Sequence, residues 1–258
     1  MPSEPGTIKD IVTQAADYAR LHMSARPFQL FSVGLLIFGS KFCVAIFDRD
    51  GIQFSPVKDI WDDVRTFIRV IRRLACDMSP VQLGQDPTIR ILTDREAVPW
   101  QYKAKEMGLQ SFPIYAVTMG TGSHCWYTLG PPIWSSLSLL GRGTTVWRVC
   151  DSSKPDEILV LKNAWRSGER LAESTIYEAI QGTHPGVAEY KFGADVVFPG
   201  EDRLISVNNL RGDSGITNMP ILHRLLIATI GRPLWDYTSD LELLQGVRSA
   251  LKGWLLSP

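Results

Sequence analysis

The sequence predicts an α+β fold, in which an N-terminal α/β region precedes an antiparallel sheet with one packed helix. Amphipathic segments with apolar residues at three- and four-residue steps are interspersed with short runs rich in Phe, Val, Ile and Leu. Short turns such as Gly39-Ser40 join neighbouring strand-like runs, which favours a mixed or antiparallel sheet in the first region. A flexible, glycine-containing break near residue 122 divides the chain into residues 1–122 and 123–258.

The N-terminal region is expected to begin with an amphipathic helix over residues 8–22, which ends before Pro27 because proline disfavours helix in the residue that precedes it. Residues 28–38 and 41–47 are apolar enough to form two strands, and residues 52–55 a short third one. These three runs predict one small sheet.

A second helix is expected over about residues 60–77, with Asp59 as its N-cap. Four arginines lie mostly off its apolar stripe, and neighbouring aspartates dilute their charge, so a solvated face is favoured over a nucleic-acid patch. Beyond it, strands are predicted over residues 88–92 and 111–119, with a short helix over residues 100–107 between them. We expect the stripe to be buried, and it consists of Val64, Phe67, Ile68, Ile71, Leu74, Ala75 and Met78.

The C-terminal half alternates strands and helices in the same way. Residues 126–129, 146–150, 158–162 and 222–230 are strand-like, with a turn between the second and third of these runs. Helices are expected over residues 169–180 and 240–255, and the latter carries a leucine-rich stripe.

Composition restricts the class of protein. The chain has 258 residues, 45% of them hydrophobic and 21% charged, and 27 basic residues balance 27 acidic ones. A net charge of zero disfavours a nucleic-acid partner. The longest apolar run is about half of the roughly 20 residues that span a bilayer, and no signal peptide is recognisable. We expect an intracellular protein, cytoplasmic or nuclear, without a membrane partner.

A glycine pair occupies the segment GRGTTVWRV. Gly141 and Gly143 are placed like the first two glycines of a phosphate-cradling loop, where backbone N–H groups approach anionic oxygens without a side chain in the way. Thr144 follows, and the third glycine of the protein-kinase pattern is absent. The alternative is an ordinary hairpin turn.

Lys162 ends the apolar run ILVLK, and a charge on a buried strand needs an anionic partner. In protein kinases that partner is a glutamate of the next helix, and the pair orients the α- and β-phosphates of ATP. Glu173 is the preferred partner, with Glu169 and Glu178 as competitors. The alternative is that Lys162 ends an edge strand and points to water.

Other sites have weaker support. The histidines lack metal-ligand spacing, and no P-loop or nucleophile-elbow motif is present. Residues 229–232 could form the linker that holds adenine, and Asp213-Ser214-Gly215 is interpreted as a turn. A metal-nuclease site on the first region is a further alternative, against which surface charge is favoured, and its residues would be Asp86, Asp94, Glu96, Lys103 and Lys105.

Several segments together resemble the fungal-type protein kinase domain family. They are DYARLHMSARPFQLFSVGLLIFGSKFCVAIFDRDGIQFS, LGQDPTIRI, GRGTTVWRV with VLKNAW, and HRLLIATIGRPLWDYTSDLELLQGVRSALKGW. The resemblance implies a family-specific N-terminal region, a kinase-like small lobe and ATP-dependent phosphorylation of protein Ser/Thr. It also implies that Gly141 and Gly143 cover phosphates and that Lys162 pairs with Glu173.

The family pattern continues with a His-Arg-Asp loop and a metal-binding Asp, and neither occurs here. We therefore expect a truncated kinase that carries the first helix of the large lobe, is inactive alone, and has no catalytic base or metal ligand of its own. ATP is the expected cofactor, and Mg²⁺ only if the missing segment is supplied. A protein substrate or partner is expected, and the alternative function is a non-catalytic module that docks a partner protein through an apolar face.

Overall fold

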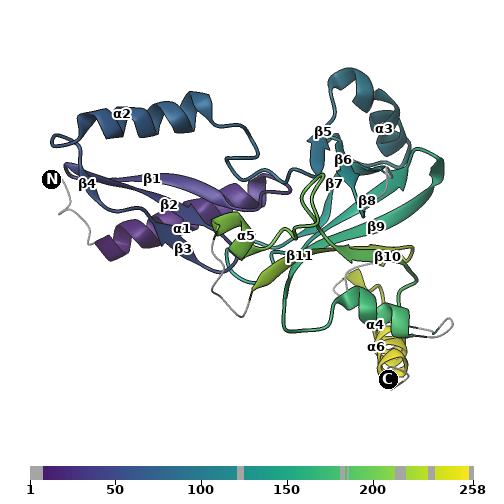
Figure 1. The fold of residues 1–258 in the computed structure, drawn as a ribbon. Coiled ribbons are helices and arrows are strands. Elements are labelled where there is room, and N and C mark those ends of the chain that lie inside the picture. The colour runs from purple at the N-terminus through teal and green to yellow at the C-terminus, as the bar shows by residue number, and fades with distance from the viewer. Residues whose placement is uncertain are drawn as a thin grey trace.

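The computed structural model describes residues 8–120, 125–180, 184, 186–212, 219–231 and 236–255. It contains a four-stranded sheet in the N-terminal part and a seven-stranded sheet after it (Figure 1). All strand pairs of both sheets are antiparallel, so the expected α+β class is confirmed. In chain order the elements are α1 (Ile8–Ala25), β1 (Ser32–Phe38), β2 (Lys41–Phe47), β3 (Ile52–Phe54), β4 (Lys58–Asp59), α2 (Val64–Arg72), a π-helical turn (Arg73–Asp77), β5 (Ile89–Ile91), α3 (Asp94–Glu106), β6 (Tyr115–Thr118), β7 (Cys125–Ser135), β8 (Thr145–Asp151), β9 (Lys154–Ser167), α4 (Glu173–Ala179), β10 (Tyr190–Asp195), α5 (Val207–Arg211), β11 (Pro220–Ile227) and α6 (Asp240–Leu255).

The four-stranded sheet lies between two helices. Successive side chains of a strand point to opposite faces, and on β2 Cys43, Ala45 and Phe47 point to the face that α1 covers. Phe42 points to the other face, where its ring meets Phe67 of α2 at a centroid distance of 5.0 Å. Of the helices described, none is long and apolar enough to cross a bilayer.

The start of the second helix differs from its prediction. α2 begins at Val64 because Asp63 is the N-cap, and the Asp63 carboxylate accepts a hydrogen bond from the amide of Thr66 at 3.2 Å. Asp59, the predicted cap, instead accepts hydrogen bonds from the Ser40 hydroxyl and from the backbone N–H of Trp61.

The predicted burial of the second helix is also wrong. No residue of α2 or of the π-helical turn after it is buried, and Val64, Ile68 and Ile71 are exposed. A helical apolar stripe shows that a helix is amphipathic, but it does not say how much of the sheet lies beneath it.

The seven-stranded sheet has the order β10-β11-β9-β8-β7-β6-β5. β5 and β6 precede residue 122, yet they extend the sheet from β7, which follows that residue. The sheet is therefore continuous across the expected boundary, and the division into two domains stays a prediction. Residues 121–124, which include Gly122 and Ser123 of the predicted break, lie outside the described residues.

Strand register places Lys162 on one face of this sheet. Val146 of β8 and Leu225 of β11 lie directly opposite Lys162, and such residues share a face. The other face carries Trp147 and Leu161, which are fully buried in a core that the N-terminal region completes. That core covers one face, which leaves the Lys162 face for α4.

α4 packs closely against the Lys162 face. A Cβ at Gly193 of β10 would lie 2.6 Å from the Cβ of Ser174, so only glycine permits this approach. α4 is shorter than predicted, because residues 169–172 form a turn before Glu173.

Other boundaries also differ from the predictions. β9 extends well beyond residues 158–162 at both ends, and α3 begins at Asp94, where Thr93 and Glu96 form a capping box. β10 and α5 were not predicted, whereas α6 has the predicted bounds.

Candidate functional site

The loop between β7 and β8, residues 136–144, contains the predicted glycine pair. Gly141 and Gly143 have φ angles of +82° and +46°, a region that favours glycine. The backbone N–H of Trp165 donates to the carbonyl of Arg142 at 2.8 Å, which connects the loop to the C-terminal part of β9.

Thr144 closes this loop. Its carbonyl accepts a hydrogen bond from the backbone N–H of Ser136 at 2.9 Å, so the two ends of the loop are joined. Its side chain is half-buried. The loop therefore leaves β7 and enters β8 as one compact turn.

The structure brings Lys162 and Glu173 together. The Lys162 Nζ donates to both carboxylate oxygens of Glu173, each at 2.7 Å, and both side chains are about three-quarters buried. Of the two competitors, Glu178 accepts a hydrogen bond from the Tyr190 hydroxyl instead. The alternative in which Lys162 points to water is therefore wrong.

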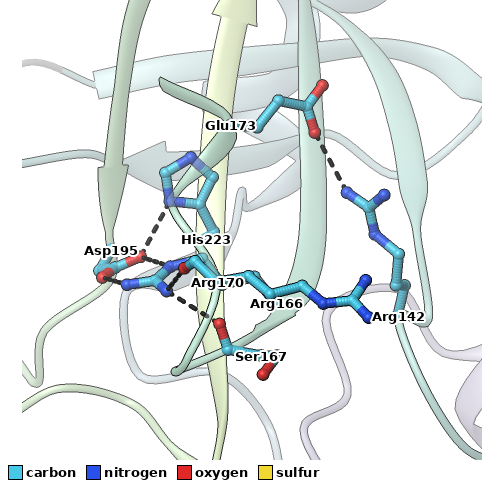
Figure 2. A network of polar contacts seen from close by, with 7 residues as sticks. All are labelled: Arg142, Arg166, Ser167, Arg170, Glu173, Asp195 and His223. Atoms are coloured by element: carbon cyan, nitrogen blue, oxygen red, sulfur yellow. Dashed lines mark hydrogen bonds and ion pairs between the residues drawn. The ribbon is translucent and has the colours of Figure 1, made fainter. Parts of the chain in front are cut away.

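Arg142, which lies between the two glycines, also contacts Glu173. Its Nη2 donates to the Glu173 Oε2 at 3.1 Å, as Figure 2 shows. Burial raises the pKa of Glu173, but the hydrogen bonds and charges of Lys162 and Arg142 outweigh burial, and the net pKa is lowered. One carboxylate thus joins the glycine loop, the strand lysine and helix α4.

A cavity of about 780 Å³ opens over this ion pair, between the glycine loop, the end of β9 and the start of α4. Its wall includes the two carboxylates Asp50 and Glu173. Basic side chains outnumber them, which gives the cavity a positive potential that favours an anion. These basic residues are Arg49, Arg142, Lys162, Arg166 and Arg170.

A second polar network lies beside the first (Figure 2). The Asp195 carboxylate accepts hydrogen bonds from the Arg166 guanidinium and contacts the Nδ1 of His223 at 2.9 Å. The Arg166 Nη1 also donates to the carbonyls of Ser167 and Arg170. This network holds the turn between β9 and α4 in place, and it thereby fixes the position at which α4 begins with Glu173.

The pKa of Asp195 predicts a pH dependence of stability. Burial raises this pKa, but hydrogen bonds from Arg166 and His223 prevail and lower it from 3.8 to about 2. Because the folded pKa is depressed, the stabilisation is complete above about pH 4 and is lost as the pH falls through 2. We expect a contribution of about 2 kcal/mol at pH 5, of which roughly half is lost at pH 3.

Urea unfolding of the wild type and of Asp195→Asn between pH 5 and pH 3 measures this dependence. The amide cannot titrate, so the difference in unfolding free energy between the two proteins should shrink as the pH falls. A difference that stays constant over this range would contradict the assignment.

The phosphates of a nucleotide fit this site better than a metal ion does. An ordered glycine turn, an ammonium and several guanidinium groups face one cavity, and these groups match a polyanion. Within the described ranges no three His, Cys, Asp or Glu side chains are grouped to hold a metal. The described residues of this cavity therefore do not form a Mg²⁺ site.

Two of the three acidic residues proposed for the nuclease alternative have structural roles. Asp86 is fully buried in an ion pair with Arg224, and Glu96 caps α3 and pairs with Arg90. Thr229 and Ile230 of the proposed adenine linker are exposed after β11. Arg232 and the Asp213-Ser214-Gly215 turn lie outside the described residues.

Two contributors to the site were not predicted from the sequence. Arg142 sits in the glycine motif itself, and its charge between two glycines was a local signal that it faces the Lys162–Glu173 pair. Arg49 lies 89 residues before Ser138, the first loop residue to which it donates, and nothing local points to it. The cofactor-binding roles of Gly141, Gly143, Thr144, Lys162 and Glu173 stay predictions.

Fold and site together define a protein-kinase-like small lobe: glycine loop, strand lysine and helix glutamate occur in that order and meet in space. The model of the fungal protein kinase family matches residues 3–216, and the chain belongs to this family. Searches of the curated proteins and of the solved structures found no match.

Proposed function

We propose that this protein binds ATP between its glycine loop and the Lys162–Glu173 ion pair, as part of the Ser/Thr protein phosphorylation that its family implies. The observation that carries the proposal is the ion pair at 2.7 Å beside an ordered glycine turn, on the wall of a positively charged cavity. An edge strand with a solvent-facing lysine offers no such site.

The ion pair leaves donors for a phosphate. An ammonium has three N–H groups, and Lys162 directs hydrogen bonds to the two oxygens of Glu173. A further N–H of Lys162 can therefore reach a phosphate oxygen, while Glu173 holds the ammonium in place. The Gly141 N–H already donates to the Arg49 carbonyl, so the other backbone N–H groups of the glycine turn would supply uncharged donors to the same anion.

Phosphoryl transfer needs a catalytic base and metal-binding carboxylates in addition. The 258 residues contain no His-Arg-Asp and no Asp-Phe-Gly sequence, and the described residues contain no group of three His, Cys, Asp or Glu side chains that could hold a metal. We expect these residues to bind nucleotide without phosphorylating a peptide. Phosphoryl transfer to any peptide by the purified chain would contradict this expectation.

Lys162→Met tests the nucleotide site. Because charge-assisted hydrogen bonds contribute about 1.5–3 kcal/mol, we expect ATP affinity to fall by roughly 10- to 100-fold. Isothermal titration calorimetry measures it, and circular dichroism checks that the variant is folded. Lys191→Met is the matched control, since Lys191 is a lysine of β10 that pairs with Glu189 outside the cavity. Equal ATP affinity in both variants would exclude Lys162 from the site.

A non-catalytic module that docks a partner protein is the second candidate function. The observation that favours it is the exposed apolar stripe of α6, which contains Leu241, Leu244, Val247 and Leu251. Size-exclusion chromatography with light scattering distinguishes the candidates. A stable monomer that binds ATP favours the first, and self-association without nucleotide binding favours the second.

A further inference from the structure

Arg49 belongs to the turn between β2 and β3, yet it contacts the glycine loop directly. Its carbonyl accepts a hydrogen bond from the backbone N–H of Gly141 at 3.0 Å. Its Nη1 donates to the carbonyls of Ser138 at 2.6 Å and Leu139 at 3.2 Å. One residue of the N-terminal region thus holds three main-chain groups of the loop.

The Arg49 guanidinium also lies flat against Gly143. A Cβ at Gly143 would lie 2.3 Å from the Cζ of Arg49, closer than atoms can approach. The second glycine of the motif is therefore needed for two reasons: its φ of +46° and the arginine beneath it. The loop and the N-terminal turn are packed as one unit.

Arg49 carries a charge that no carboxylate of the described residues neutralises. The side chain is 7% exposed, and in the described part of the chain no carboxylate lies within ion-pair distance of it. Among the described residues its buried Nε finds no hydrogen-bond partner, and burial lowers the pKa of Arg49 to about 10. A buried cation without a counter-ion is costly, and this one lines the cavity over Lys162.

The turn that carries Arg49 is itself anchored. The Asp48 carboxylate accepts hydrogen bonds from the backbone N–H groups of Asp50 and Gly51, and also from the Nε and Nη2 of Arg211, both at 2.7 Å. Arg211 belongs to α5, next to the seven-stranded sheet (Figure 1). The turn is therefore held from both sides, and Arg49 has a defined position.

We propose that Arg49 is a positioning residue of the nucleotide site, which holds residues 136–144 in the shape that receives a triphosphate and adds an uncompensated positive charge beneath it. The identity of the anion rests on the proposed function, whereas the support of the loop does not. In this proposal the N-terminal region contributes a residue to the nucleotide site, although the predicted phosphate-binding motifs all lie in the C-terminal half.

Arg49→Met tests the proposal, since methionine keeps an apolar stem of similar reach and removes the charge and the donors. We expect ATP to bind at least about tenfold more weakly, with the affinity for adenosine, which lacks phosphates, changed less than about twofold. We also expect faster hydrogen–deuterium exchange in the peptide that covers residues 136–145 of the nucleotide-free protein. Arg49→Lys keeps the charge and one donor and should recover part of the ATP affinity.

Arg65→Met, an exposed arginine of α2, is the matched control and should change none of these quantities. An unchanged ATP affinity in Arg49→Met would overturn the proposal, and so would an equal loss for ATP and adenosine. If the wild type binds no ATP, the proposed function is wrong. The hydrogen–deuterium exchange experiment then still tests whether Arg49 positions the loop. Faster exchange in residues 136–145 supports the positioning role, and unchanged exchange refutes it.

Discussion

Asp86→Ala is expected to lower the free energy of unfolding by about 3–5 kcal/mol, because it leaves a fully buried arginine without its counter-ion. Asp86 and Arg224 are 0% and 1% exposed and form an ion pair. The Arg224 Nε also donates to Asn163, and its Nη1 donates to Thr88 and to the carbonyl of Thr118. A loss of this size is a large share of the 5–15 kcal/mol typical of a folded domain.

Chemical denaturation measures the loss of unfolding free energy. Two further variants serve as controls that separate the effect of the buried charge from other effects. Asp17→Ala removes an exposed partner of Arg20 and should cost less than about 1 kcal/mol. The double variant Asp86→Leu with Arg224→Met removes both buried charges and should recover part of the loss. If the double variant is no more stable than Asp86→Ala, the uncompensated charge is not the cause.

Trp147→Ala is expected to cost about 3–5 kcal/mol, as truncation of a fully buried aromatic residue does. Trp147 of β8 is 0% exposed, stacks on Phe28 with centroids 5.3 Å apart and contacts the edge of Tyr115. The indole thus joins the kinase-like strands to the N-terminal region. Its removal leaves a cavity where the two meet.

The matched control is Trp134→Ala, because Trp134 of β7 is about half exposed and should change stability far less. Trp147→Phe should cost less than Trp147→Ala, since a ring remains and the indole N–H has no partner in the described structure. Thermal or urea unfolding of the three variants tests this ranking. Equal losses for Trp147→Phe and Trp147→Ala would refute the role of stacking.

Local patterns predicted those helices and strands whose apolar residues recur with a regular period over several turns or residues. The apolar runs of β1 and β2 and the amphipathic segments of α1 and α6 were placed within a few residues. β10 was missed because its sequence, YKFGAD, is polar and partly exposed. The stripe of α2 was assigned to the core because the period of a helix reveals an apolar face without revealing what covers it.

The part of the candidate site that consists of short sequence motifs was predicted from the sequence. A glycine pair, a lysine on an apolar run and a glutamate on the next helix stand in an order that has chemical meaning, and the predicted Lys162–Glu173 contact is observed at 2.7 Å. The predicted helix over residues 169–180 contained all three candidate glutamates, and the structure places Glu173 at the first position of α4, in contact with Lys162.

By itself, the sequence determined the fold class, the hairpin of β1 and β2, and the order of the residues that could bind a phosphate. These features follow from hydrophobic periodicity and turn residues, which act over a few neighbouring residues. Only the tertiary structure decided that Arg49 supports the glycine loop across 89 residues and that Asp86 neutralises Arg224 across 138. The Arg49 contacts depend on how the two sheets pack, and the Asp86–Arg224 pair depends on how the segment before β5 folds against β11. A buried charge meets its partner only when the chain between them is folded.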